Sequence, residues 1–583
     1  MSGRPLLADA GSSDAFDLLN SWFHDCLTSH PRCRELLSTK QSMWNSDQPL
    51  LSTPPSLPTR VIDVGPPDGS GRARLFITGG VEGKYATLSH CWGKVQILTT
   101  TKANIEAHLK CIPFGKLPKT FQDAIIITRR LNLQYLWIDS LCIVQDDKQD
   151  WRNESVNMGL IYQNSEITIA ASGASDGRGG CFLPRRPLAQ PIELPHVRNG
   201  VKEPENSLFF ALYPDSESDL ELTPLSTRAW ITQEWMLSRR IIHYTQPRMV
   251  WACKSRVESE DGEMIPDMDD QRLLRSCADY KKFKDDPSAG DSSTPIGFFS
   301  DWCDLVSTYC SRSLTYVEDK PLAIQGLVQE IWKGVYERYE EGIWSLVPNS
   351  RPRHQQQASH DSFAVANSRA RCACLSMQLL WHAKADITRP KALQPMPSWS
   401  WLSTLGPITY HAPARTAAPL TQKLTITSSF YDEEEETTIQ CAPRLDITTP
   451  LTSLQNTVFT LATRYSGTEI PFYSQTSFSS YAMIRPAQMY LLTNADNAPL
   501  GWASFDEADV PIRDNHPLIY AAALSTNEFN GRHDGYNVLL LKKGTTKDIQ
   551  NLDQESFFTR LGMGEIVMPG FFQESMMTSF HAH

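Results

Sequence analysis

Glu234 is the first candidate for a catalytic residue in this sequence. On a helical wheel, Glu234 falls on the same side as Trp230 and Leu237, so its carboxylate is expected to point inward. Burying a carboxylate costs free energy unless a partner compensates for it or a function requires it. Glu234 is therefore either a catalytic group that stabilises positive charge or one half of an ion pair with Arg228 or Arg239. The sequence leaves both alternatives open.

A second glutamate shows the same kind of pattern in an earlier segment. Glu154 falls within the helical arc that Trp151, Met158 and Ile161 define. It is a candidate for substrate binding, but a structural ion pair with a cation such as Arg129 is the favoured interpretation.

Other candidate binding residues follow two predicted strands. Trp92 would offer a planar surface for stacking, and Gly93 would let the backbone approach a ligand closely. Asp139 could accept hydrogen bonds from the hydroxyl groups of a sugar. The alternative is that Trp92 and Trp137 are core residues and that Asp139 caps the turn that follows it.

Three potential metal ligands occur close together near the N-terminus. Cys26, His30 and Cys33 have the side chains that bind zinc, but no fourth ligand follows at a suitable spacing. The segment is therefore predicted to be a packed helix and turn without metal. The 13 cysteines are an odd number and are scattered along the chain, which favours reduced thiols over a disulfide framework.

Strands and helices are predicted to alternate in the first half of the chain. Short apolar runs at 85–89, 135–139 and 167–171 predict strands, and residues 121–131 and 148–162 have helical spacing. This β-α-β-α-β order predicts an α/β fold with a doubly wound, mainly parallel sheet. Ligands of such sheets bind beyond the carboxyl ends of the strands, so the candidates that follow these strands are expected to share one crevice.

Composition and pattern divide the chain into five parts. They are predicted as an N-terminal helical extension with a linker (1–83), the α/β domain (84–253), a polar linker (254–295), a mainly helical region (296–410) and a β-rich C-terminal region (411–583). Within the α/β domain, the Pro- and acid-rich residues 183–226 are predicted to be an irregular insertion.

The charge composition argues against nucleic acid as a partner. The chain has 55 Lys and Arg against 66 Asp and Glu, a net charge of −11, so it has no broad basic surface for phosphates. No segment approaches the roughly 18 apolar residues that span a bilayer, and no signal peptide is evident, so a cytoplasmic protein is expected. Walker-type, G-x-G-x-x-G and H-E-x-x-H motifs do not occur.

Several motifs together resemble the HET (heterokaryon incompatibility) domain of filamentous fungi. The motifs are Tyr85-x2-Leu88-Ser89-x2-Trp92-Gly93, Leu117-Pro118-x-Thr120, Tyr135-Leu136-Trp137-Ile138-Asp139, Trp151-x2-Glu154 and Arg228-Ala229-Trp230-x2-Gln233-Glu234. Two positions depart from the family pattern: His90 stands where many members carry Tyr or another residue, and Trp235 replaces a frequent Arg or Lys.

The resemblance implies a role in fungal self/non-self recognition or programmed cell death. HET domains are similar in fold to Toll/interleukin-1 receptor (TIR) domains, some of which hydrolyse NAD through a glutamate in a W-C-x-x-E pattern. The spacing from Trp230 to Glu234 is the same, with Ile231 in place of the cysteine. By this analogy Glu234 is the catalytic candidate, Trp230 joins the binding residues, and NAD is a substrate rather than a bound cofactor.

Two other functions remain open. The domain could be a non-catalytic signalling module that binds an unknown protein partner or self-associates. The chain could instead be an accessory protein of a fungal secondary-metabolite pathway, because its 15 tryptophans are compatible with an aromatic pocket.

Overall fold

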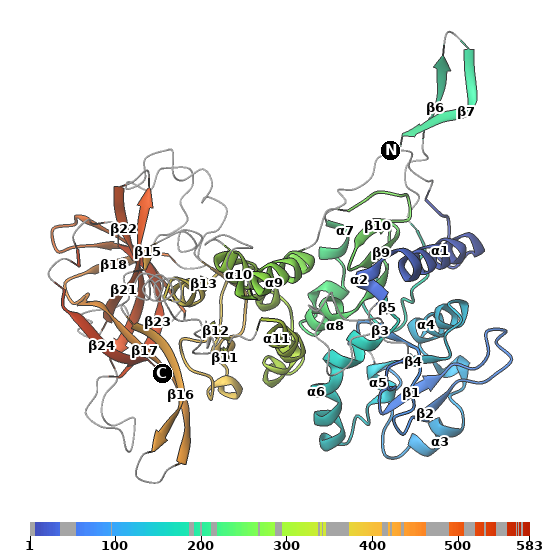
Figure 1. Ribbon diagram of the computed structural model, residues 1–583, viewed down its shortest axis with the longest axis horizontal. Coiled ribbons are helices and arrows are strands. Elements are labelled where there is room, and N and C mark those ends of the chain that lie inside the picture. Colours follow the sequence, from blue (N-terminus) through green and yellow to red (C-terminus); the bar gives the residue numbers. More distant parts are fainter. Residues whose placement is uncertain are drawn as a thin grey trace. The chain divides into compact units, whose positions relative to one another are not determined.

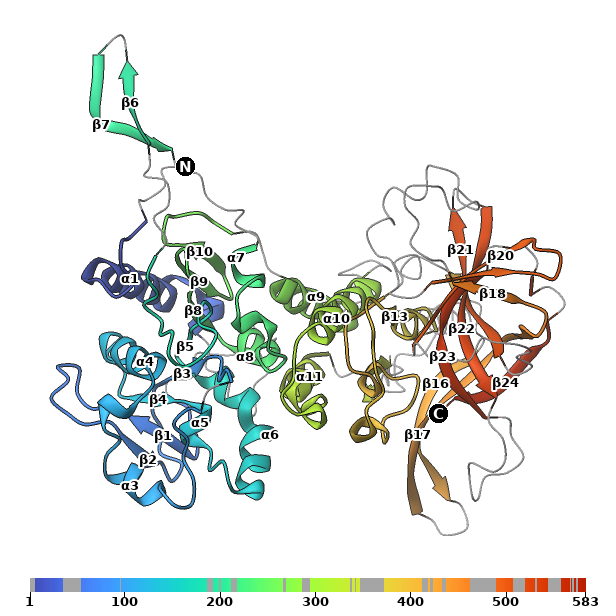
Figure 2. The ribbon, with the colours of Figure 1, turned by 180° about the vertical axis from the view of Figure 1, so that it is seen from behind.

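The chain folds into two compact units, which are described separately. Unit 1 comprises residues 1–271 and 321–330, and unit 2 comprises 272–320 and 331–583. The computed structural model (Figures 1 and 2) describes residues 6–34, 54–94, 96–185, 192–198, 201–210, 218–265, 269–285, 294–335, 338–340, 342–345, 372–410, 418–419, 423–432, 437–461, 489–506, 519–529, 532–543, 557–566, 568, 571–572 and 575–582.

Unit 1 is built on an eight-stranded sheet with the order β10-β9-β8-β5-β3-β4-β1-β2. Its strands are β1 (Arg60–Asp63), β2 (Arg74–Ile77), β3 (Tyr85–Ser89), β4 (Tyr135–Trp137), β5 (Ile167–Ala170), β8 (Arg240–Tyr244), β9 (Met249–Cys253) and β10 (Arg256–Ser259). The predicted parallel pairing of strands 85–89 and 135–139 is confirmed by the register Tyr85↔Tyr135.

The predicted mainly parallel sheet is wrong in one respect, because the sheet is mixed. The four central strands β4, β3, β5 and β8 are parallel, whereas β1–β2 on one side and β9–β10 on the other run antiparallel. Antiparallel neighbours need only short connections, so these hairpins extend the sheet without crossover helices.

Helices cover both faces of the parallel strands, as predicted for a doubly wound sheet. The Tyr85 hydroxyl donates to the carbonyl of Ile161 in α6 (Lys148–Asn164) at 2.7 Å, so this face of β3 lies under α6. His90, one residue beyond β3, faces the opposite way and packs on Phe121 of α4 (Lys119–Arg130). The helices predicted at 121–131 and 148–162 are thus confirmed.

The order of the parallel strands creates a reversal point. Numbered along the chain, β4-β3-β5-β8 places the second strand beside the first and the third on the first strand's other side. The connection that leaves β3 leads to β4 on one side of it, whereas the connection from β4 returns across to β5 on the other side. The loops therefore diverge at the carboxyl ends of β3 and β5. Ligands of doubly wound sheets bind at such a point.

Further elements complete unit 1. They are α1 (Ser13–Ser29), α2 (Pro31–Arg34), α3 (Ile105–Lys110), η1 (Phe114–Lys116), α5 (Asp139–Cys142), β6 (Ile192–Arg198), β7 (Val201–Phe210), α7 (Ser218–Glu221), η2 (Leu225–Thr227) and α8 (Ile231–Leu237). The predicted irregular insertion at 183–226 contains the β6–β7 hairpin. Strands β1 and β2, from the predicted extension 1–83, belong to the central sheet.

The described part of the middle of the chain consists of helices and short strand pairs. Its elements are α9 (Asp269–Asp285), α10 (Thr294–Cys310), η4 (Val317–Asp319), α11 (Leu322–Val335), β11 (Arg338–Glu340), β12 (Ile343–Ser345), β13 (Trp381–Ala383), η6 (Lys391–Leu393), η7 (Trp401–Ser403) and β14 (Ile408–Tyr410). The segment 254–295, predicted as a polar linker, contains β10 and α9.

The β-rich C-terminal region is confirmed. A ten-stranded sheet, antiparallel except for the pair β23–β24, contains β15 (Ala418–Pro419), β16 (Lys423–Asp432), β17 (Thr437–Ser453), β18 (Val458–Leu461), β19 (Tyr490–Thr493), β20 (Pro499–Phe505), β21 (Ile519–Phe529), β22 (Arg532–Lys543), β23 (Phe557–Ile566) and β24 (Met577–Ala582). Among the helices of the described residues, none combines the length and the apolar composition needed to cross a membrane.

Candidate functional site

Glu234 lies inside unit 1 and is held at the carboxyl end of β3. Its side chain points inward from α8, as the helical wheel predicted, and only 2% of the residue is exposed. The Ser89 hydroxyl, at the last position of β3, donates a hydrogen bond to Glu234 Oε2. This contact places the carboxylate at the end of β3, which lies between β4 and β5 at the reversal point of the sheet.

Arg228 is the cation that acts on Glu234. Burial raises the pKa of Glu234, and the charge of Arg228 and the hydrogen bond from Ser89 counteract that rise. Burial alone would lower the pKa of Arg228, but the carboxylates of Glu234 and Asp139 outweigh it and raise that pKa. Of the two partners predicted for Glu234, the structure therefore favours Arg228. Arg239 instead lies 3.9 Å from Glu166.

Trp92 and Asp139 lie together at the same end of the sheet. The indole Nε1–H of Trp92 donates to Asp139 Oδ2 at 2.8 Å. Asp139 Oδ1 also accepts the backbone N–H of Ser140 at 2.7 Å, but Asp139 is the first residue of α5, whose N-cap is Ile138 and which has no side-chain cap, so the expected capping of the following turn by Asp139 is not observed. Trp92 is half-buried, whereas Trp137 is a fully buried core residue.

Gly93 and Trp230 have mainly structural contacts in this arrangement. The backbone of Gly93 has a φ of 70°, and a Cβ there would lie 2.4 Å from the Cβ of Asp176 in the loop after β5. Glycine is therefore required for the close approach of these two loops. Trp230 is half-buried and packs against the hydrophobic core of the unit.

His90 belongs to the same cluster, although sequence reasoning did not select it as a site residue. It is 1% exposed, neither ring nitrogen has a hydrogen-bond partner among the described residues, and Nδ1 lies 3.8 Å from Asp139 Oδ1. Burial lowers the pKa of His90 to about 4, against the opposing effect of Asp139. The imidazole is therefore neutral at pH 7. Its position directly after β3 was the available sequence signal.

Tyr162 was also missed by sequence reasoning. Its hydroxyl donates a hydrogen bond to the carbonyl of Leu88 at 3.1 Å. Burial raises the pKa of the Tyr162 phenol, and the nearby charge of Glu234 raises it further. The helical arithmetic for this segment was applied to Glu154 and not to Tyr162, and periodicity carries no information on which strand the phenol would reach.

A comparison with protein families adds independent information on this segment. Residues 85–234 match the family model described as heterokaryon incompatibility protein (HET). The chain carries a HET domain. This domain implies a role related to heterokaryon incompatibility, and the matched segment runs from the first residue of β3 to Glu234. No curated protein and no solved structure matches the chain.

Glu154 lies within the HET domain but has different neighbours from Glu234. Its Oε1 is 3.8 Å from the guanidinium of Arg60, which also binds Asp150 at 2.6 Å. Burial raises the pKa of Glu154, while a hydrogen bond with Thr59 and the charge of Arg60 oppose the rise. The structure thus gives Glu154 the ion pair that was the favoured interpretation, with Arg60 rather than Arg129 as the cation.

The reason for excluding a metal does not hold in the folded chain. Cys26, His30 and Cys33 were predicted to lack a fourth ligand. Cys253, at the end of β9, brings its sulfur into the same group. Within the described part of the chain, these four residues form a group whose side chains could hold a metal ion. None of them belongs to the cluster around Glu234.

Proposed function

We propose that this chain is an effector of heterokaryon incompatibility whose HET domain promotes cell death by hydrolysing NAD. The position of Glu234 carries the proposal: it is a buried carboxylate at the reversal point of a doubly wound sheet, beside a hydroxyl and a cation. The spacing from Trp230 to Glu234, shared with TIR domains that cleave NAD, supports the same assignment.

The chemistry needs a carboxylate that can stabilise positive charge. The bond between the ribose C1′ and the nicotinamide nitrogen breaks, and its electron pair neutralises the pyridinium ring. The ribosyl group becomes cationic, water adds to C1′, and one proton of that water is released, which yields nicotinamide and ADP-ribose. An ionised Glu234 would stabilise the cationic transition state.

The neighbouring side chains have complementary roles in this proposal. Asp139 would accept hydrogen bonds from ribose hydroxyls, and the half-buried indole of Trp92 would stack on a planar ring. Both side chains now bind each other at 2.8 Å, and Glu234 is 2% exposed. Because Glu234 is almost fully buried, binding of a substrate there requires neighbouring side chains to move.

The test is the release of nicotinamide from NAD by the purified full chain. Glu234→Gln should abolish release because the amide cannot stabilise a cation as a carboxylate does. Glu260→Gln is the matched control: Glu260 is also buried and ion-paired, with Arg185, but lies outside the cluster. Release by the Glu234→Gln variant at the wild-type rate would refute the catalytic role.

A non-catalytic interaction module is the second candidate. The nearly complete burial of Glu234 and the balance between its charge and that of Arg228 are what a structural ion pair requires. In that case the HET domain would act by binding a protein partner or a second copy of itself. Cell killing by a well-folded Glu234→Gln variant, with no loss of cellular NAD, would favour this function.

A further inference from the structure

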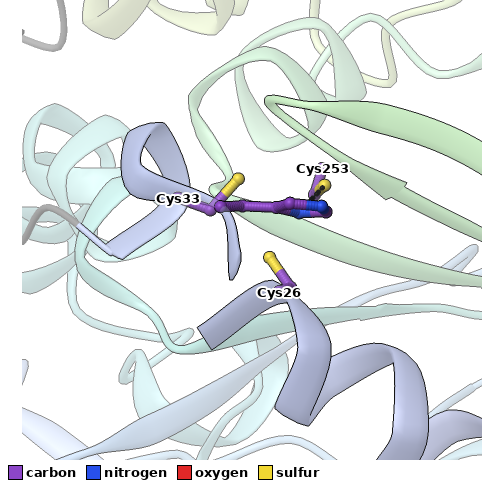
Figure 3. Close-up of side chains that lie close together, drawn as sticks. Cys26, Cys33 and Cys253 are labelled. Carbon is purple, nitrogen blue, oxygen red and sulfur yellow. Dashed lines mark hydrogen bonds between the residues drawn. The ribbon is translucent and has the colours of Figure 1, made fainter. Parts of the chain in front are cut away.

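Helix α1 and the β9–β10 hairpin bring four metal-binding side chains together. Cys26 lies in the last turn of α1, His30 follows that helix, and Cys33 lies in the short helix α2. Cys253 is the last residue of β9, 223 positions after His30. Figure 3 shows the sulfur atoms of the three cysteines turned toward one another, with Cys26 and Cys33 on N-terminal helices and Cys253 on a strand.

The distances within this cluster fit one tetrahedral ion. The four ligand atoms all lie within 4.8 Å of one another, and Cys253 Sγ is 3.5 Å from His30 Nδ1. With Zn–S bonds of about 2.3 Å and Zn–N bonds of about 2.0 Å, ligand atoms around tetrahedral zinc are roughly 3.3 to 3.8 Å apart. Small side-chain movements are enough to reach that geometry.

The chemistry of the ligands selects the metal. Three thiolates and one imidazole form a soft set that suits zinc, whereas magnesium and calcium prefer oxygen ligands. Four protein ligands complete a tetrahedral shell, so the set leaves no open position for a substrate; the three cysteines are buried and His30 is half-buried. A closed site of this kind is structural rather than catalytic.

A buried arginine supplies the charge that this site needs. Zinc with three thiolates and a neutral imidazole carries one net negative charge, which is unfavourable in a buried place. The Arg240 Nε–H donates to Cys26 Sγ at 3.2 Å, and the same guanidinium donates to the carbonyl of Cys33. Arg240 is itself completely buried, directly opposite Cys253 in the β8–β9 ladder. Such contacts orient thiolate ligands and balance their charge.

We propose that Cys26, His30, Cys33 and Cys253 bind one structural zinc ion that fastens the N-terminal helices to the β9–β10 hairpin of the HET-domain sheet. The inference does not depend on the activity proposed above. Independent contacts join the same elements: Asp25 pairs with Arg256 at 2.8 Å, and the rings of Trp22 and Trp251 lie 6.2 Å apart. Loss of the metal should therefore weaken this attachment without preventing folding.

The first test is the metal content of the full chain, purified without a histidine tag. We expect about one zinc per chain, a tenfold or greater loss in Cys253→Ser, and full retention in Cys181→Ser. Cys181 is a matched control because it is equally buried in the core of the same unit but outside the cluster. Zinc retained by Cys253→Ser, or no zinc in wild-type protein even after incubation with zinc, would overturn the proposal.

A second test does not rely on the folding of a variant. Wild-type chain, stripped by a chelator and loaded with cobalt, should acquire the visible absorption bands of tetrahedral Co²⁺ bound to thiolates. The melting temperature should fall by several degrees on stripping and recover when zinc is added back. A disulfide among the three cysteines in freshly purified protein, detected as a mass loss of two hydrogens, would also overturn the proposal.

Discussion

Replacement of Glu234 by glutamine should cost little stability, although the carboxylate is buried. The amide keeps the shape and an oxygen that accepts the Ser89 hydroxyl, so a hydrogen bond to a charged acceptor becomes one to a neutral acceptor, a loss of about 1 kcal/mol. The raised pKa means that burial outweighs the help from Arg228, and a neutral side chain avoids part of that cost. The expected loss in free energy of unfolding is about 1 kcal/mol.

Removal of the cation should be far more damaging. Arg228→Met removes the charge of a half-buried guanidinium that acts on both Glu234 and Asp139, and leaving the buried carboxylate of Glu234 uncompensated costs about 3–5 kcal/mol. Each kcal/mol shifts the melting temperature of a domain this large by roughly 2–4 °C. Glu234→Gln should therefore lower the melting temperature by about 2–4 °C, and Arg228→Met by about 6–20 °C.

Scanning calorimetry of the full chain can measure both effects. The chain has two compact units, so the transition that shifts in Arg228→Met identifies the unit with the HET domain. Because the folded-state pKa of Glu234 is raised, its stabilising contribution is present below about pH 4.5 and is lost as pH rises through that pKa. The difference in free energy of unfolding between wild type and Glu234→Gln should thus become smaller toward neutral pH. A shift in Glu234→Gln as large as that in Arg228→Met would refute this reasoning.

Two further predictions concern the packing around Gly159 and the titration of His90. Gly326→Ala would place a Cβ 2.6 Å from Gln233 Oε1 and 2.9 Å from the Cα of Gly159, so urea denaturation should show a loss of about 1–3 kcal/mol in the free energy of unfolding. The control Gly297→Ala, whose Cβ would have nothing within 4 Å, should show no loss. Equal denaturation midpoints for the two variants would contradict this packing. His90, with a pKa near 4, should make the wild type lose up to about 3 kcal/mol as pH falls from 6.5 to 4, because the folded state resists protonation. His90→Phe should lessen that acid loss, and an unchanged pH profile would exclude His90 as its source.

Local patterns in the sequence were sufficient for the central architecture. The helices at 121–131 and 148–162 could be predicted because each depends on periodicity within its own segment. The parallel pairing of 85–89 with 135–139 followed from the alternation of strands and helices, which favours parallel neighbours. The inward direction of Glu234 followed from the same helical arithmetic. The antiparallel edges could not be predicted, because pairing between hairpins and a central sheet depends on contacts between distant segments.

Tertiary structure decided which side chains meet. The choice of Arg228 for Glu234 and of Arg60 for Glu154 depends on where loops and strand ends lie after folding. The zinc-type cluster shows the same limit: Cys26 and His30 are neighbours on one helix end, but Cys253 joins them only when β9 pairs within the sheet. Residue types and periodicity are local properties that a sequence states directly, whereas a ligand set or an ion pair is a property of distances that only the folded chain defines.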